Sequence, residues 1–172
     1  MRGDACEASR RGEQSEGLLD LRMQCLDRRL GELRALTTLF AARADPEVLD
    51  KAIPAVMDLP SLARCADAET LLAAYPPPDD PATRREVDAL RVRLDEIAAL
   101  SLAGKATAGA ALASGVVDDA ARIGWPPIHA QALYWLGQLQ SWAGDAATSA
   151  ATLERAVQRA AEARDDTLLL QA

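Results

Sequence analysis

Two helices joined by a tight turn are predicted by residues 133–156, LYWLGQLQSWAGDAATSAATLERA, and this stretch decides the fold. Gly137 offers a small residue where a partner helix can cross, and Gly144 can adopt the left-handed conformation that ends a helix. Asp145 follows at a position where its side chain can cap the next helix. The apolar residues expected in mutual contact across the pair are Leu133, Leu136, Leu153 and Ala156.

This pattern resembles the tetratricopeptide (TPR) repeat, a helix pair of about 34 residues that stacks into a solenoid and binds other proteins. It departs from that repeat where Gln140 replaces an aromatic residue and Ser149 replaces an alanine. The turn glycines Gly104 and Gly144 are 40 residues apart, so the spacing is longer than the standard one. We therefore predict two units, the first degenerate, and the opening of a third at Asp165-Asp166.

Composition favours an all-α chain. The 172 residues include 37 alanines and only six aromatic residues. Alanine has the highest helix propensity, and β-branched and aromatic residues never alternate as they do in strands. The length suffices for one domain with a core or for two small ones.

Apolar periodicity, prolines and turn residues predict where the elements lie. Residues 4–42 are expected to form one long helix, and Asp45-Pro46 should open another that is kinked at Pro54. Further helices are expected over 68–74, 82–102, 106–123, 128–142, 146–163 and 167–172. The segment YPPPDDP (75–81) is the clearest linker, because consecutive prolines favour extended geometry. We accordingly divide the chain into an N-terminal helical section (1–75), a linker (76–81) and a repeat section (82–172).

Other parts of the chain resemble a second, larger context. The strings are ACEASR (5–10), GEQS (12–15), LDLRM (19–23), PSLARCAD (60–67), PPP (76–78) and IGW (123–125). They are similar to the region after the catalytic domain in large bacterial serine/threonine protein kinases with TPR arrays, as in myxobacteria. The resemblance covers nearly the whole chain and implies a sensor or docking region, or a fragment of one.

The motifs of kinase chemistry are missing from this sequence. A kinase needs a glycine-rich loop, a strand lysine, a catalytic-loop aspartate and Asp-Phe-Gly. The only phenylalanine is Phe40, which follows Leu39. We expect a non-catalytic TPR-type interaction or scaffold module that needs no cofactor. The alternative is a TPR sensor region of a large transcriptional regulator or of another signalling protein.

The net charge of −7 is unevenly spread, because residues 1–45 hold eight acidic and eight basic side chains. An acidic chain without a basic stripe argues against nucleic-acid binding. No apolar run approaches the ~20 residues of a membrane span, and the N-terminus lacks an apolar signal segment. We expect a cytoplasmic protein that binds a protein or peptide.

Four polar residues are the candidate partner-binding groove: Gln131, Tyr134, Gln138 and Ser141. The TPR resemblance implies that these steps of the first repeat helix line the concave face. Repeats that grip a peptide carboxylate carry Lys and Asn where Tyr134 and Gln138 stand, so that kind of clamp is not expected. The alternative is that the four residues merely solvate an exposed helix face.

The remaining chemistry-bearing residues point to structural roles. Cys6, Cys25 and Cys65 lack CxxC spacing and are expected to be reduced thiols. His129 has no Cys or His at ligand spacing, so we expect no metal site and an ordinary surface or capping role. Helix capping is expected for the pairs Asp79-Asp80 and Asp165-Asp166. The tryptophans expected in the core between repeats are Trp125, Trp135 and Trp142.

The C-terminal end predicts an incomplete unit. Leu168, Leu169 and Leu170 have no second helix after them to cover their apolar side chains. Solenoid units bury their hydrophobic faces only against neighbours. We expect self-association through this end, or marginal stability of the chain alone.

Overall fold

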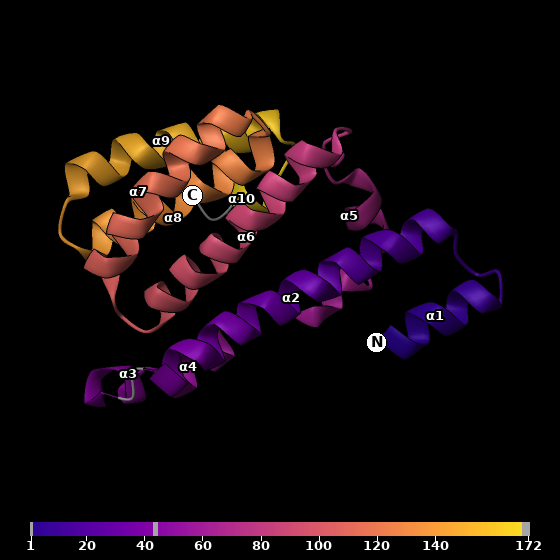
Figure 1. Cartoon of the computed structure of the whole chain (residues 1–172), viewed down its shortest axis with the longest axis horizontal. Coiled ribbons are helices and arrows are strands. Elements are labelled where there is room, and N and C mark those ends of the chain that lie inside the picture. Colours follow the sequence, from indigo (N-terminus) through magenta and orange to yellow (C-terminus); the bar gives the residue numbers. More distant parts are fainter. Residues whose placement is uncertain (1, 43–44, 170–172) are drawn as a thin grey trace.

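The computed structural model describes residues 2–42 and 45–169, and every regular element in these ranges is helical, which confirms the all-α prediction. The elements in chain order are α1 (Arg2–Arg10), α2 (Glu16–Ala42), α3 (Pro46–Asp50), α4 (Ala52–Met57), the 3₁₀ turn η1 (Leu62–Cys65), α5 (Ala68–Ala73), α6 (Pro81–Leu102), α7 (Ala106–Ile123), α8 (Pro126–Trp142), α9 (Ala146–Glu162) and α10 (Asp166–Leu169). Figure 1 shows α6 to α9 gathered into a bundle, with the long helix α2 running beside α6.

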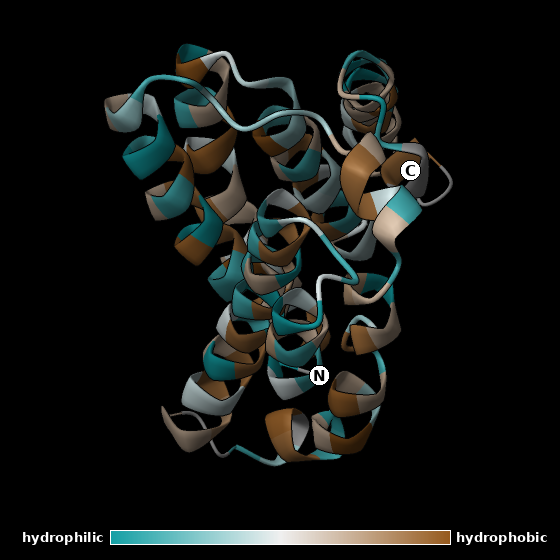
Figure 2. Ribbon diagram, turned by 90° about the vertical axis from the view of Figure 1, so that its right-hand side faces the viewer, coloured by the Kyte–Doolittle hydropathy of each residue, from teal (hydrophilic) through white to brown (hydrophobic). Residues whose placement is uncertain are grey.

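Each helix of the bundle packs against the one before it and the one after it. The helix α6 contacts α7, α7 contacts α8, and α8 contacts α9; α6 also reaches α8, and α10 rests on α8 and α9. Hydrophobic and hydrophilic residues alternate in bands along the helices (Figure 2). The buried core residues are Val87, Leu90, Leu94, Ile97, Ala113, Val116, Val117, Ala120, Ile128, Ala132, Leu133, Leu139 and Ala156.

The predicted packing of α8 against α9 is present in part, and Leu153 is partly exposed. Leu133 and Ala156 are fully buried in the core, while Leu136 packs against it and is partly exposed. A Cβ added to Gly137 would lie 2.7 Å from Cγ of Leu153, so the glycine allows the two helices to approach closely. The hydroxyl of Ser149 donates a hydrogen bond of 2.8 Å to the Gly137 carbonyl, which accounts for a serine where the repeat pattern has alanine.

The predicted turn at Gly144 is also confirmed. Its φ is +90°, and the N–H of Asp145 donates to the Gln140 carbonyl at 2.9 Å, closing the end of α8. The Asp145 side chain accepts a hydrogen bond from the Thr148 N–H at the start of α9. The same backbone hydrogen bonds recur at Gly104, whose φ is +76°. The two turns therefore share one conformation, 40 residues apart.

Replacing Gly144 with alanine is expected to lower the free energy of unfolding by about 1 kcal/mol, because a residue with a Cβ is strained at positive φ. A Cβ at this position would meet no atom within 4 Å, so backbone strain is the only cost. The matched control is Gly115→Ala, inside α7, which should be stabilising through helix propensity. Urea unfolding checks both variants. Equal shifts of the urea midpoint in the same direction for both variants would exclude the turn conformation as the cause of the lost stability.

The N-terminal helix predicted over 4–42 is wrong in one respect, because the chain breaks into α1 and α2. The break lies at residues 11–15, where Gly12 has a φ of +71°. The hydroxyl of Ser15 then accepts a hydrogen bond from the Leu18 N–H and caps the start of α2. Polar residues dominate around this glycine, so little burial offsets its low helix propensity.

The expected reduced state of all three cysteines is also wrong. Cys25 and Cys65 form a disulfide, whereas Cys6 is free and exposed. The bond ties η1 to the middle of α2, and both cysteines are buried beside Leu26 and Leu71. Sequence spacing could not reveal this pair, because 40 residues separate its members along the chain.

The predicted kink near Pro54 is present as a division into two short helices, α3 and α4, at Lys51. The Asp45 side chain caps α3 by accepting a hydrogen bond from the Val48 N–H at 2.9 Å, as expected. Four apolar side chains on α3 and α4 remain more than half exposed: Leu49, Ile53, Val56 and Met57.

The linker is tied to the turn between α7 and α8. The indole N–H of Trp125 donates to the Pro76 carbonyl at 3.1 Å, and the Tyr75 ring meets the indole edge-on. The guanidinium of Arg91 lies 5.3 Å from the Trp125 ring centroid. The helix α8 begins at Pro126, two residues before the predicted start, because proline suits the first turn of a helix.

Candidate functional site

The predicted groove residues lie along α8, but they have different surroundings. Gln131 and Ser141 are exposed, and Gln138 is partly buried. The Tyr134 ring meets Trp135 edge-on, with ring centroids 5.3 Å apart, and it packs against the cluster that holds Leu168 of α10. Tyr134 therefore supports the contact with α10, whereas Gln131 and Ser141 are the members of the set most open to a partner.

A small cavity of about 80 Å³ lies beside Gln131. Its walls come from α2, from the segment after α4, from α6 and from α8, and they include Glu32, Pro60, Leu102 and Trp135. The N-terminal section thus closes one end of the α8 face. Sequence reasoning placed no residue of α2 near this face, since no local pattern connects them.

A group of charged residues lies at the same crossing of α2 and α6. A Cβ at Gly31 would collide with the Asp95 carboxylate, so the glycine leaves room for this side chain of α6 against α2. Glu32 forms an ion pair of 2.9 Å with Arg29. Burial, together with the nearby negative charge of Glu32, raises the pKa of Asp95 to about 6. Burial likewise raises the pKa of Glu32, against the opposing effect of Arg29.

Asp95→Asn is expected to stabilise the chain at pH 7 by about 1–2 kcal/mol, a figure reduced for the partial exposure of the group. Between pH of about 4 and 6, native Asp95 keeps a proton that the unfolded chain has released. The free energy of unfolding of the wild-type chain should therefore fall as the pH rises through this window. The variant should lack that fall in denaturant titrations at pH 4, 5, 6 and 7. Parallel curves for the two proteins would contradict the assignment.

The predicted surface position of His129 is wrong, because its side chain is buried. Burial lowers the pKa of its imidazole, and Arg159 and Arg155 act in the same direction. The predicted core position of Trp142 is also wrong, because this side chain is 58% exposed. Trp125 and Trp135 do pack against the core, as predicted.

One member of each aspartate pair, Asp80 or Asp165, serves as a helix cap. Asp80 accepts hydrogen bonds from the backbone N–H and the hydroxyl of Thr83, and these bonds lower the pKa of its carboxyl. Asp165 accepts from the Leu168 N–H at the start of α10. Leu168 is buried against Ala130 and Ala160, Leu169 is partly buried, and Leu170 lies outside the described residues.

Residues 2–42 and 45–169 contain neither a metal-ligating cluster nor a membrane-crossing helix. No group of three or more His, Cys, Asp or Glu side chains in these ranges could hold a metal ion. No helix there is long and apolar enough to cross a membrane.

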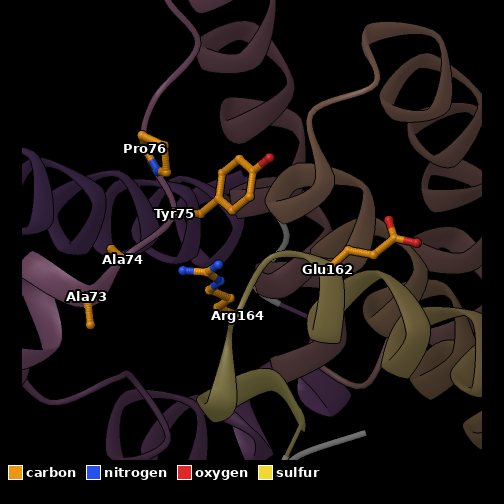
Figure 3. Close-up of a pocket in the computed structure, with 6 residues that line it drawn as sticks. All are labelled: Ala73, Ala74, Tyr75, Pro76, Glu162 and Arg164. Carbon is orange, nitrogen blue, oxygen red and sulfur yellow. The ribbon is translucent and has the colours of Figure 1, made fainter.

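A larger cavity of about 340 Å³ was not anticipated from the sequence. It lies between the end of α5 and the end of α9, and Figure 3 shows the residues that line it. Tyr75 and Pro76 come from one side, and Glu162 and Arg164 from the other. Arg164 occupies the turn position that Gly104 and Gly144 fill elsewhere, with a φ of +52°. An arginine at the position where the two earlier turns have glycine was the signal available in the sequence.

Comparisons with known protein families, with curated proteins and with solved structures found no match for this chain.

Proposed function

We propose that this chain is a non-catalytic protein-interaction module built from TPR-like helix pairs, a docking or regulatory region related to bacterial serine/threonine kinases. The observation that carries the proposal is the α8–α9 pair. It combines a close crossing at Gly137, a positive-φ turn at Gly144 and a capping Asp145. These are the features that make a helix pair stackable.

Two further contacts support stacking. The α6–α7 pair ends its first helix with the same backbone hydrogen bonds at Gly104. On the other side, Leu168 of α10 packs against Ala130 and Ala160, as the first helix of a following pair would. The order of packing from α6 to α10 is the order expected of a one-dimensional array.

The partner surface in this proposal is the α8 face around Gln131, Gln138 and Ser141. Uncharged hydrogen-bonding side chains on an exposed helix suit a peptide or protein surface better than a charged substrate. Capture of partners from cells of the source organism tests this face. The double variant Gln131→Arg/Ser141→Arg should lose partners that the wild-type chain retains, with unchanged thermal unfolding. The matched control is Glu154→Arg on exposed α9. Equal loss from the control would overturn the assignment of the face.

The proposal includes the absence of catalysis. Calorimetry with Mg-ATP should show no saturable binding, because the sequence provides no loop to hold the phosphates. Saturable, magnesium-dependent binding would contradict this part.

The alternative function is a TPR sensor region of a large transcriptional regulator or other signalling protein. Both hypotheses assign the chain to a TPR-type interaction module, and they differ in the domain that accompanies this module. A kinase catalytic domain in the same gene supports the first, whereas a nucleotide-binding or DNA-binding domain supports the second.

We also propose a cytoplasmic location. Reducing compartments keep most thiols unpaired, so the Cys25–Cys65 bond is the observation that weighs against this location. Alkylation of free thiols during lysis tests this location, because a Cys25–Cys65 pair that is fully oxidised in native cells would contradict a cytoplasmic protein.

Self-association through the C-terminal end is also part of the proposal, and analytical sedimentation at rising protein concentration tests it.

A further inference from the structure

The cavity between α5 and α9 combines one positive charge with an aromatic and apolar wall. Arg164 extends toward Tyr75 and Ala74, and the Glu162 carboxylate points away from the guanidinium (Figure 3). Glu162 is engaged by Arg159 at 2.7 Å. No ion pair joins Arg164 to a carboxylate within the described part of the chain. The guanidinium is therefore available to a ligand.

The backbone at Arg164 is held in an unfavourable conformation. Its N–H donates to the Ala161 carbonyl, and the next N–H, that of Asp165, donates to the Ala160 carbonyl. The turns at Gly104 and Gly144 make the same bonds, but there glycine removes the steric conflict of a Cβ. Strained residues of this kind concentrate at ligand sites. The arginine thus occupies a position where the fold alone would favour glycine.

The other wall of the cavity is suited to an apolar group. Ala73 and Ala74 contribute methyl groups, Pro76 contributes its ring, and Tyr75 is 36% exposed. The Pro76 carbonyl is held by the Trp125 indole, and the Tyr75 ring meets that indole edge-on. This wall is therefore fixed in place before any ligand arrives. The volume, about 340 Å³, lies at the lower end of the range typical of small-ligand sites.

We propose that this cavity binds the carboxylate of a peptide whose neighbouring side chain is aromatic or aliphatic. The Arg164 guanidinium would hold the carboxylate through paired N–H groups, and the apolar side chain would lie against Tyr75 and Pro76. A monoanion is favoured over a phosphate dianion, because there is one free guanidinium and the Glu162 carboxylate lies on the same rim. The site is separate from the α8 face and does not depend on that face binding a partner.

The test uses the 172-residue chain and a minimal probe, N-acetyl-L-phenylalanine, which carries one carboxylate and one ring. Amide ¹H–¹⁵N shifts should move saturably at residues 73–76 and 162–165. The matched probe is N-acetyl-L-phenylalanine amide, which lacks the carboxylate and should bind at least ten-fold more weakly. Equal binding of the two probes, or shifts that avoid these residues, would overturn the proposal.

Variants separate the role of the side chain from that of the fold. Arg164→Gly should weaken the acid probe at least ten-fold while its unfolding temperature equals or exceeds that of the wild type. Arg164→Asn, which also tolerates positive φ, should behave in the same way. The control Arg155→Ala removes a positive charge from exposed α9 and should leave binding unchanged. Undiminished binding by Arg164→Gly, or preferential binding of phenyl phosphate by the wild-type chain, would refute a carboxylate site.

Discussion

Replacing Gly137 with valine is expected to destabilise the repeat section by about 3 kcal/mol, the upper part of the range for overpacked cores. The added Cβ would lie 2.7 Å from both Cγ and Cδ2 of Leu153, and 3.4 Å from its backbone nitrogen. The contact with the nitrogen is an ordinary one, so the conflict is with the Leu153 side chain, and it is relieved by displacing that side chain or by separating the two helices. Their separation would also stretch the hydrogen bond from Ser149 to the Gly137 carbonyl. Urea unfolding measures the loss.

A double-mutant cycle isolates the crossing as the cause. Gly137→Ala should be destabilising in the wild-type chain but neutral or stabilising when combined with Leu153→Ala. The second substitution removes the Leu153 side-chain atoms that the added Cβ would overlap. Gly115→Ala inside α7 is the control, because its Cβ would meet only the Arg93 guanidinium at an ordinary 3.6 Å. Additive effects of the two substitutions would show that Gly137 does not mark the closest approach of α8 and α9.

Removing the disulfide is expected to cost about 4 kcal/mol in the free energy of unfolding, the loss of chain entropy that a 40-residue loop imposes on the unfolded state. The double variant Cys25→Ala/Cys65→Ala, or treatment of the wild type with a reductant, should produce this loss. The effect should centre on η1 and α5, which contact α2 around the bond. Amide hydrogen exchange in α5 should accelerate more than exchange in α8.

The free cysteine supplies the control for this prediction. Cys6→Ser changes an exposed thiol and should leave both the urea midpoint and the exchange rates unaltered. A reductant should then have no further effect on the double variant. If reduction leaves the wild-type midpoint unchanged, the Cys25–Cys65 bond does not constrain the chain.

Local signals in the sequence were sufficient for the repeat section. The boundaries of α6, α7 and α9 lie within one residue of those predicted, because each is defined by a cap, a turn glycine or a proline next to an apolar stripe. The apolar stripe of α6 is buried, with Leu94 and Ile97 in the core. Such features act within a few residues of each other, so a single sequence contains them in full.

Features that depend on distant segments were not predictable in the same way. The pairing of Cys25 with Cys65, the burial of His129 and the cavity beside Arg164 all arise where separate elements meet. Gly31 illustrates the difference. From local propensity it weakens α2, yet in three dimensions it permits the contact with Asp95 of α6. Only the packing of the two helices gives it that role.

The central claim, that the exposed face of α8 receives a protein partner, is tested most directly by site-specific photocrosslinking in cells of the source organism. A photoreactive residue would replace Gln131 or Ser141 on α8, and Asp118 on α7 or Glu154 on α9 as exposed controls. The account predicts that the two α8 positions capture the same protein and that the two control positions do not. Capture of that protein with equal yield from all four positions, or capture only from the controls, would contradict it.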